Sequence, residues 1–149
     1  MVYDIDHIAI VVKKIEETMP VYTRILGFRV KNIEDLPQMH VRVAMLESSN
    51  GTTHIELIEP LVPDTGVSRF LDKKGESVHH LCFTVEDLQG ELDRLKAQGI
   101  RLIDEIPRKG EGGSMVAFLH PESCRGLLIE LKQRAQYQKS NIKNQINIK

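Results

Sequence analysis

The feature that most limits how this chain can fold is an internal repeat. The segment DHIAIVV (residues 6–12) is followed by a charged, helix-like stretch that ends at Gly27. The segment HHLCFTV (residues 79–85) is followed in the same order by a similar stretch that ends at Gly99. Self-similarity of this kind indicates one supersecondary unit present twice. We therefore expect two equivalent modules.

Hydrophobic periodicity predicts the same elements in both halves. Apolar, β-branched runs over residues 5–12 and 78–85 have the length and composition of strands. Residues 14–26 and 87–97 show helical spacing instead, and Pro20 predicts a kink or a late start in the first of these helices. Three further strands are expected after each helix, at residues 28–33, 40–47 and 53–59, and at 101–105, 114–119 and 126–132.

These elements predict an α+β fold of tandem β-α-β-β-β modules in one domain that covers residues 1–149. Module one spans about residues 4–60 and module two about 77–132. The linker, about residues 61–76, is rich in turn residues and ends in a short helix over 67–74. Residues 133–149 form a polar and basic tail without a recognisable motif.

Charge and composition exclude several classes of protein. The 149 residues carry 20 Lys and Arg against 21 Asp and Glu, so there is no positive field to hold nucleic acid or an anionic membrane. The two cysteines, Cys82 and Cys124, lack Cys-x-x-Cys spacing and are interpreted as free thiols. Neither a secretory signal nor an apolar run of membrane-spanning length is present. We expect a cytoplasmic protein.

Each predicted module carries one histidine and one glutamate at equivalent places. His7 lies on the first strand and His80 on the fifth, whereas Glu56 and Glu130 lie on the strands that close the modules. Strand alternation directs all four side chains away from the bulkier apolar neighbours. A buried carboxylate is costly unless it is paired or binds a metal, and two at equivalent positions require a common reason.

The repeated His/Glu pair therefore predicts a metal site. If the modules pair about a pseudo-twofold axis, His7, Glu56, His80 and Glu130 converge in one cleft. Two imidazoles and two carboxylates suit divalent Zn, Ni, Co, Mn or Fe. His79 is expected to be an outer hydrogen-bonded or packing residue, and His54 is a reserve ligand.

Three other features have structural interpretations. His40 is expected at the surface or the rim of the cleft, and His120 is expected to fix a His-Pro turn. The glycine-rich stretch from Arg108 to Ser114 is not a Walker loop. It predicts either a simple hairpin or a flexible lip whose amides meet an anionic ligand.

With these residues in view, the chain from about residue 4 to residue 132 resembles the vicinal oxygen chelate superfamily, and within it the methylmalonyl-CoA epimerases. The resemblance lies in DHIAIVV, YTRILGF, HIELIEP, HHLCFTV and most specifically GEGGSMVAFLHPESCRGLLIEL. It implies an incomplete, barrel-like cleft around one divalent metal ion (Co, Zn, Ni or Mn), an acyl-CoA substrate and a homodimer.

The implied reaction is a 1,1-proton transfer at the α-carbon of methylmalonyl-CoA. Glu130 is the first candidate for a catalytic carboxylate and Glu56 the second. Some family members carry another acid on the third strand, but residues 41–46 supply none, so a water could serve instead. Two alternatives stay open: a glyoxalase I-type enzyme acting on a thiol adduct, and a non-catalytic binding protein of the resistance type.

Overall fold

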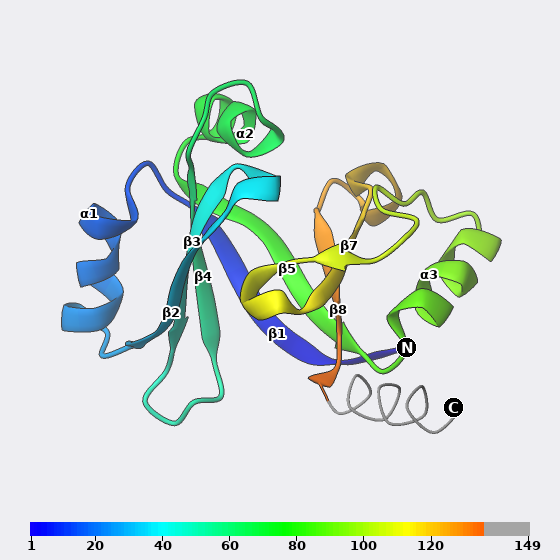
Figure 1. Ribbon diagram of the computed structural model, residues 1–149, viewed down its shortest axis with the longest axis horizontal. Coiled ribbons are helices and arrows are strands. Elements are labelled where there is room, and N and C mark those ends of the chain that lie inside the picture. Colours follow the sequence, from blue (N-terminus) through cyan, green and yellow to red (C-terminus); the bar gives the residue numbers. More distant parts are fainter. Residues whose placement is uncertain (136–149) are drawn as a thin grey trace, which may run out of the picture. The chain divides into compact units, whose positions relative to one another are not determined.

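The computed structural model describes residues 1–135, in which the strands and helices follow the predicted order (Figure 1). Most of the predicted polar tail, residues 136–149, lies outside the described residues. The first half contains β1 (Val2–Val11), α1 (Ile15–Pro20), β2 (Arg29–Leu36), β3 (Val41–Glu47) and β4 (His54–Pro60). The linker contains α2 (Gly66–Lys74), and the second half contains β5 (Ser77–Val85), α3 (Leu88–Ala97), β6 (Arg108–Lys109), β7 (Met115–Leu119) and β8 (Ile129–Gln133).

The chain divides into two compact units. One consists of Asp6–Leu81, and the other of Met1–Ile5 together with the residues from Cys82 onward. The division falls inside β1 and β5, so each of these strands contributes residues to both units. The predicted module boundaries and the shared barrel-like cleft stay predictions.

In the unit Asp6–Leu81 the strand order is β2-β3-β4-β1. The neighbours β2, β3 and β4 pair antiparallel, whereas β1 runs parallel to β4 with Ala9 opposite Glu56. One face of this sheet packs against α1. The core on that face consists of Val12, Ile15, Ala44, Leu46, Ile55 and Leu57.

The first helix changes form at Pro20, where the sequence predicts a kink or a late start: the α-helix begins at Ile15 and ends at Pro20. Proline has no N–H to donate to the carbonyl of the preceding turn, so the α-helical ladder cannot continue regularly. After Pro20 the chain forms a π-helical turn over Val21–Ile25, in which Leu26 N–H donates to Val21 O at 3.2 Å. This turn places Tyr22 against the core beside Phe28.

In the other unit the strand order is β5-β8-β7-β6, and α3 covers one face of these strands. Asp87 caps α3 by accepting a hydrogen bond from Gly90 N–H at 3.1 Å. The core between α3 and the strands consists of Val85, Leu88, Leu92, Ala117, Leu119 and Leu131.

The strand predicted over residues 101–105 is wrong. That segment makes a single bridge, Leu102 to Leu119, and β6 is a two-residue strand at Arg108–Lys109. The carboxylate of Asp104 accepts a hydrogen bond from Phe118 N–H at 2.8 Å. This side chain therefore occupies the donor that a neighbouring strand would otherwise use, and the ladder stops.

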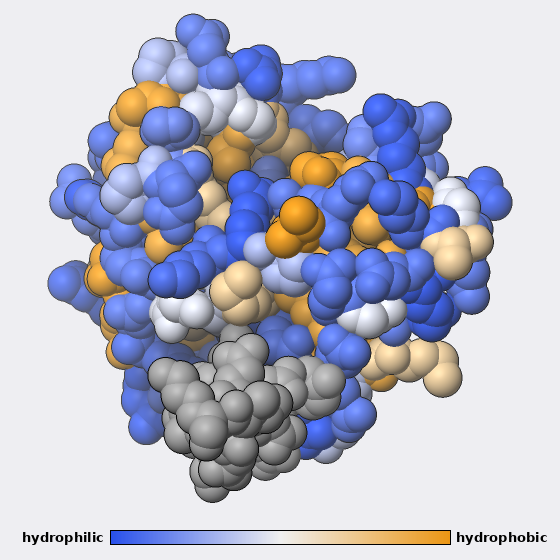
Figure 2. Space-filling model, turned by 45° about the vertical axis from the view of Figure 1, so that its right-hand side comes forward, coloured by the Kyte–Doolittle hydropathy of each residue, from blue (hydrophilic) through white to orange (hydrophobic). Residues whose placement is uncertain are grey.

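The α+β class and the β-α-β-β-β order of both halves are confirmed. The described residues contain no helix that is long and apolar enough to span a membrane. Hydrophobic residues appear as separate groups among hydrophilic ones on the face shown in Figure 2. Cys82 and Cys124 are not joined in a disulfide, as predicted.

Candidate metal centre

Three of the four predicted ligands meet on one face of the sheet in the unit Asp6–Leu81. Strand alternation puts Glu56 on the face opposite Ile55 and Leu57, which pack against α1. His7 is likewise on the face opposite Ile8 and Ile10. This arrangement is the one that the alternation of residues predicted.

The three side chains are buried and close together. His7 is 3% exposed, Glu56 5% and His80 3%. His7 Nε2 lies 3.4 Å from His80 Nε2 and 3.8 Å from Glu56 Oε1. One ligand atom from each residue lies within 4.8 Å of the other two.

The separation of the two imidazole nitrogens fits binding to a single metal ion. Two ligands that each lie about 2.1 Å from one ion are about 3.0–3.4 Å apart at octahedral or tetrahedral angles, and the two imidazole nitrogens match this separation. Two neutral imidazoles and one carboxylate are a common set of protein ligands for a divalent transition metal. A cation would also offset the cost of burying the Glu56 carboxylate.

The second nitrogen of each histidine is hydrogen-bonded. His7 Nδ1 lies 2.8 Å from Asp6 Oδ2, so the ring donates its Nδ1 proton to that carboxylate and keeps the Nε2 lone pair. His80 Nδ1 lies 2.9 Å from His79 Nδ1, and the His79 ring packs edge-on against Phe70 at 4.7 Å. His79 is thus the outer residue that the sequence predicts.

Asp6 is a partner of the His7 ring that the sequence analysis did not predict. The available signal was the Asp-His dipeptide, since ligand histidines commonly donate their other N–H to a carboxylate. Strand alternation argued against it, because neighbouring residues point to opposite faces. The side chain of Asp6 nevertheless reaches the ring of His7 within β1.

Glu130 belongs to the other unit. It lies on β8 opposite Phe118, is 6% exposed, and points away from the face on which Ile129 and Leu131 pack. Its predicted orientation and burial agree with the structure. Its role as a fourth ligand stays a prediction.

The remaining predicted residues have structural roles. His54 is held by a 3.2 Å contact between its Nδ1 and Asp6 O, and is not a member of the cluster of His7, Glu56 and His80. His120 Nδ1 accepts a hydrogen bond from Glu122 N–H at 3.1 Å, which fixes the His-Pro turn as predicted. The glycine-rich stretch forms the hairpin between β6 and β7, where Gly112 and Gly113 have positive φ.

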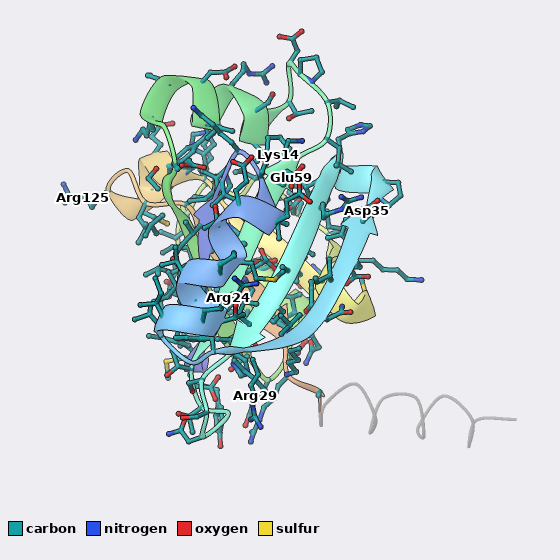
Figure 3. All side chains as sticks on the ribbon, turned by 90° about the vertical axis from the view of Figure 1, so that its left-hand side faces the viewer. Lys14, Arg24, Arg29, Asp35, Glu59 and Arg125 are labelled. Atoms are coloured by element: carbon teal, nitrogen blue, oxygen red, sulfur yellow. The ribbon has the colours of Figure 1, made fainter. Side chains whose placement is uncertain are left out.

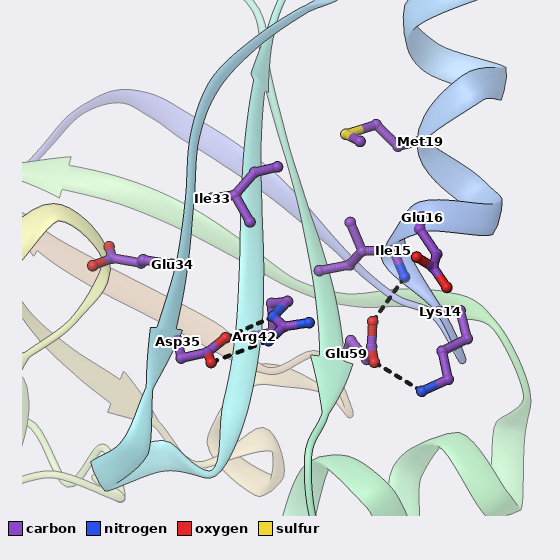
Figure 4. Close-up of a pocket in the computed structure, with 9 residues that line it drawn as sticks. All are labelled: Lys14, Ile15, Glu16, Met19, Ile33, Glu34, Asp35, Arg42 and Glu59. Atoms are coloured by element: carbon purple, nitrogen blue, oxygen red, sulfur yellow. Dashed lines mark hydrogen bonds and ion pairs between the residues drawn. The ribbon is translucent and has the colours of Figure 1, made fainter.

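A pocket lies on the opposite face of the same sheet. Its volume is about 520 Å³, and α1 forms one wall (Figure 4). Figure 3 shows Lys14, Glu59 and Asp35 at one end of the sheet, with Arg29 toward the other. The residues that line this pocket are Lys14, Ile15, Glu16, Met19, Ile33, Glu34, Asp35, Arg42 and Glu59.

Four of the six charged residues that line this pocket form two ion pairs within it. Arg42 Nε donates to Asp35 Oδ1 at 2.7 Å, and this guanidinium holds the pKa of Asp35 below its usual range. The buried carboxylate of Glu59 accepts from Ile15 N–H at 2.9 Å and from Lys14 Nζ at 3.2 Å. Glu59 therefore stabilises the start of α1.

Comparison with known proteins places this site in a family context. Residues 6–118 match the family model of the Glyoxalase/Bleomycin resistance protein/Dioxygenase superfamily. The chain is 36% identical over 135 residues to the ethylmalonyl-CoA/methylmalonyl-CoA epimerase of Cereibacter sphaeroides. This match covers 89% of this chain and 99% of that protein. It is 36% identical over 130 residues to the human mitochondrial methylmalonyl-CoA epimerase, covering 87% and 73%.

A solved structure matches equally closely. A variant of the Streptomyces coelicolor methylmalonyl-CoA epimerase, in complex with 2-nitronate-propionyl-CoA, superimposes with a TM-score of 0.85 at 35% identity. The match covers 91% of this chain and 96% of that one.

Proposed function

Because the chain belongs to the glyoxalase/bleomycin resistance protein/dioxygenase superfamily, we propose that it is a metal-dependent epimerase that interconverts the stereoisomers of methylmalonyl-CoA. The observation that carries this proposal is the buried cluster of His7, Glu56 and His80. Its support from relatives is identity to epimerases over most of the length of both chains.

The proposed cofactor is one divalent ion: Co, Zn, Ni or Mn. His7, Glu56 and His80 would hold it from one unit, and Glu130 is proposed as the fourth ligand. When bound, the ion supplies Lewis acidity to the thioester and carboxylate oxygens of an acyl-CoA substrate, which makes the α-proton more acidic. The buried setting of these side chains strengthens each electrostatic interaction at the site.

The proposed proton chemistry uses carboxylates of this chain. One group accepts the α-proton from one face of the substrate, and another returns a proton to the opposite face, so the reaction is balanced without a co-reactant. Glu130 is the proposed first group and Glu56 the second. Both are buried on strand faces that turn away from the helices, where water is scarce.

The proposal extends to the cell and to the assembly. We include a cytoplasmic location, as the sequence analysis expects, and a homodimer, which rests on the resemblance to this family. Neither is needed for the chemistry that His7, Glu56 and His80 would support.

The test is exchange of the α-proton of methylmalonyl-CoA in deuterated water, followed by proton NMR. We expect loss of the α-proton signal with metal-loaded enzyme and none with metal-stripped enzyme. Absence of exchange with each of the four metals would contradict the proposal. Formation of a lactoyl thioester from methylglyoxal and a thiol would instead favour the glyoxalase I alternative.

Glu130→Gln tests the assignment of the catalytic carboxylate. The substitution keeps the size of the side chain but removes its ability to accept a proton, so we expect the exchange rate to fall by about 100-fold or more. Glu122→Gln is a matched control, because Glu122 is an exposed glutamate in the same unit. Unchanged exchange in Glu130→Gln would show that the assignment is wrong.

A further inference from the structure

We propose that Asp6 is a positioning residue for the metal and makes His7 the more firmly held of the two imidazole ligands. The inference rests on the proposed metal site and goes beyond it, because it assigns a role to a residue that would not touch the ion. Its basis is the unequal set of partners behind the two histidines.

The partner of the His7 ring is a carboxylate, which accepts a hydrogen bond from Nδ1. Asp6 Oδ2 lies 2.8 Å from His7 Nδ1, while the His7 ring is 3% exposed and Asp6 is 21% exposed. A carboxylate at this distance fixes the tautomer with the proton on Nδ1 and the lone pair on Nε2. It also raises the basicity of the ring and thus the strength of its bond to a cation.

The geometry of His7 is consequently set before any ion arrives. Nε2 already faces His80 Nε2 at 3.4 Å and Glu56 Oε1 at 3.8 Å. A side chain that is held in its bound orientation loses little rotational freedom when the ligand binds. The negative charge of Asp6 adds a favourable long-range interaction with a divalent ion in this weakly screened site.

The contact behind His80 is different in kind. His80 Nδ1 meets the imidazole of His79 at 2.9 Å, and His79 is supported in turn by Phe70. An imidazole accepts a hydrogen bond without a full negative charge, so it polarises its neighbour less than a carboxylate does. Loss of the Asp6 contact should therefore weaken metal binding more than loss of the His79 contact.

The experiment measures zinc affinity by competition with a chelator for wild type, Asp6→Ala, Asp6→Asn and His79→Gln. We expect Asp6→Ala to weaken zinc binding by about 10- to 100-fold. Asp6→Asn, which keeps an acceptor oxygen but no charge, should fall between wild type and Asp6→Ala. His79→Gln should lose less than Asp6→Ala. Asp35→Asn is the matched control, because this carboxylate lies on the other face of the sheet.

A second readout separates positioning from a merely structural role. The thermal midpoint of the metal-free Asp6→Ala protein should stay close to that of wild type, while the rise in midpoint on adding zinc should shrink. The visible absorption of the cobalt-loaded protein should also change, because it reports ligand geometry. A zinc affinity of Asp6→Ala within twofold of wild type would overturn the proposal. So would a thermal midpoint of Asp6→Ala that falls below that of wild type by the same amount with and without zinc.

The outcomes also separate this proposal from the proposed function. Zinc binding that depends on Asp6 without exchange of the methylmalonyl-CoA α-proton would contradict the epimerase function and leave the role of Asp6 supported. If Asp6→Ala binds zinc as tightly as wild type and α-proton exchange is intact, the epimerase function is supported and the role of Asp6 is contradicted. A wild-type protein that binds none of the four metals would overturn both.

Discussion

Two faces of one sheet carry two very different groups of charged residues. One face presents His7, Glu56 and His80, whose ligand atoms converge within 4.8 Å. The other face forms the pocket beside α1, where Asp35 pairs with Arg42 and Glu59 with Lys14 and the backbone of α1 (Figure 4). The pocket is thus the part of the sheet with the weaker case for chemistry.

This difference shows what separates a reactive site from a structural one. In the pocket, Asp35 is bound by Arg42, and Glu59 by Lys14 and Ile15 N–H, so the charges are matched inside the protein. In the cluster, imidazole nitrogens and a carboxylate oxygen meet one another, and all of them are groups that bind cations. Several cation-binding atoms that converge on one point indicate a site for a metal ion. Ion pairs between opposite charges indicate that the side chains stabilise the fold.

The largest effect is expected for His7→Ala. It removes one of the two imidazoles, so we expect metal affinity to fall by more than the roughly 100-fold that outer partners contribute, and α-proton exchange to be lost. Metal content after dialysis and the exchange rate measure the effect. Full metal content in this variant would contradict the assignment of the cluster.

The matching change on the other face is Glu59→Gln. The buried carboxylate accepts from Ile15 N–H at 2.9 Å and from Lys14, so we expect a loss of about 1–3 kcal/mol in the free energy of unfolding. Zinc affinity should stay the same. Denaturant unfolding and the chelator assay together check both statements, and a parallel loss of zinc binding would remove the distinction between the faces.

Glu91 extends the comparison to the other unit, as a buried carboxylate with internal partners. Hydrogen bonding from Arg94, and then the N-terminal amine, lowers the pKa of Glu91 to about 2 against its burial. Since the folded-state pKa is below the unfolded one, the stabilisation is complete above about pH 4.5 and is lost as the pH falls toward 2.

The loss over this pH range should be on the order of 1–2 kcal/mol, because Arg94 is 41% exposed and solvent weakens the pair. Thermal unfolding between pH 5 and 2 measures it. In Glu91→Gln the part of the acid dependence that this residue contributes should disappear, and an identical profile in the two proteins would be evidence against this pairing.

The smallest effect is expected for Asp35→Asn. The ion pair with Arg42 is nearly half exposed on both sides and is screened by solvent, so its loss should lower the thermal midpoint only slightly and leave exchange unchanged. Thermal melting and the exchange assay check this. A large loss of exchange would mean that the pocket takes part in the reaction.

The sequence was sufficient for the parts of the molecule that repeat. Strand alternation around His7 and Glu56 predicted which face each would occupy, and the structure confirms it. Burial of one face is a strong constraint, since a shift of one residue would expose the core. For the same reason β3 and β4 were predicted within about one residue of their observed ends.

The parts that depend on single side-chain contacts were not predictable. The strand expected over residues 101–105 is missing because Asp104 accepts the Phe118 N–H, a contact between residues 14 positions apart. The Asp6–His7 contact conflicts with simple alternation, and the pocket depends on how α1 packs. Patterns of hydrophobicity carry no information on these individual contacts.

The most direct test of the central claim is a metal titration of the metal-stripped chain, with α-proton exchange of methylmalonyl-CoA in deuterated water as the readout. We predict that the exchange rate rises linearly with added metal and stops rising at one equivalent of divalent metal per chain. It also predicts that His80→Ala shows no such rise. Exchange that is undiminished without metal, or absent at every metal occupancy, would contradict the claim.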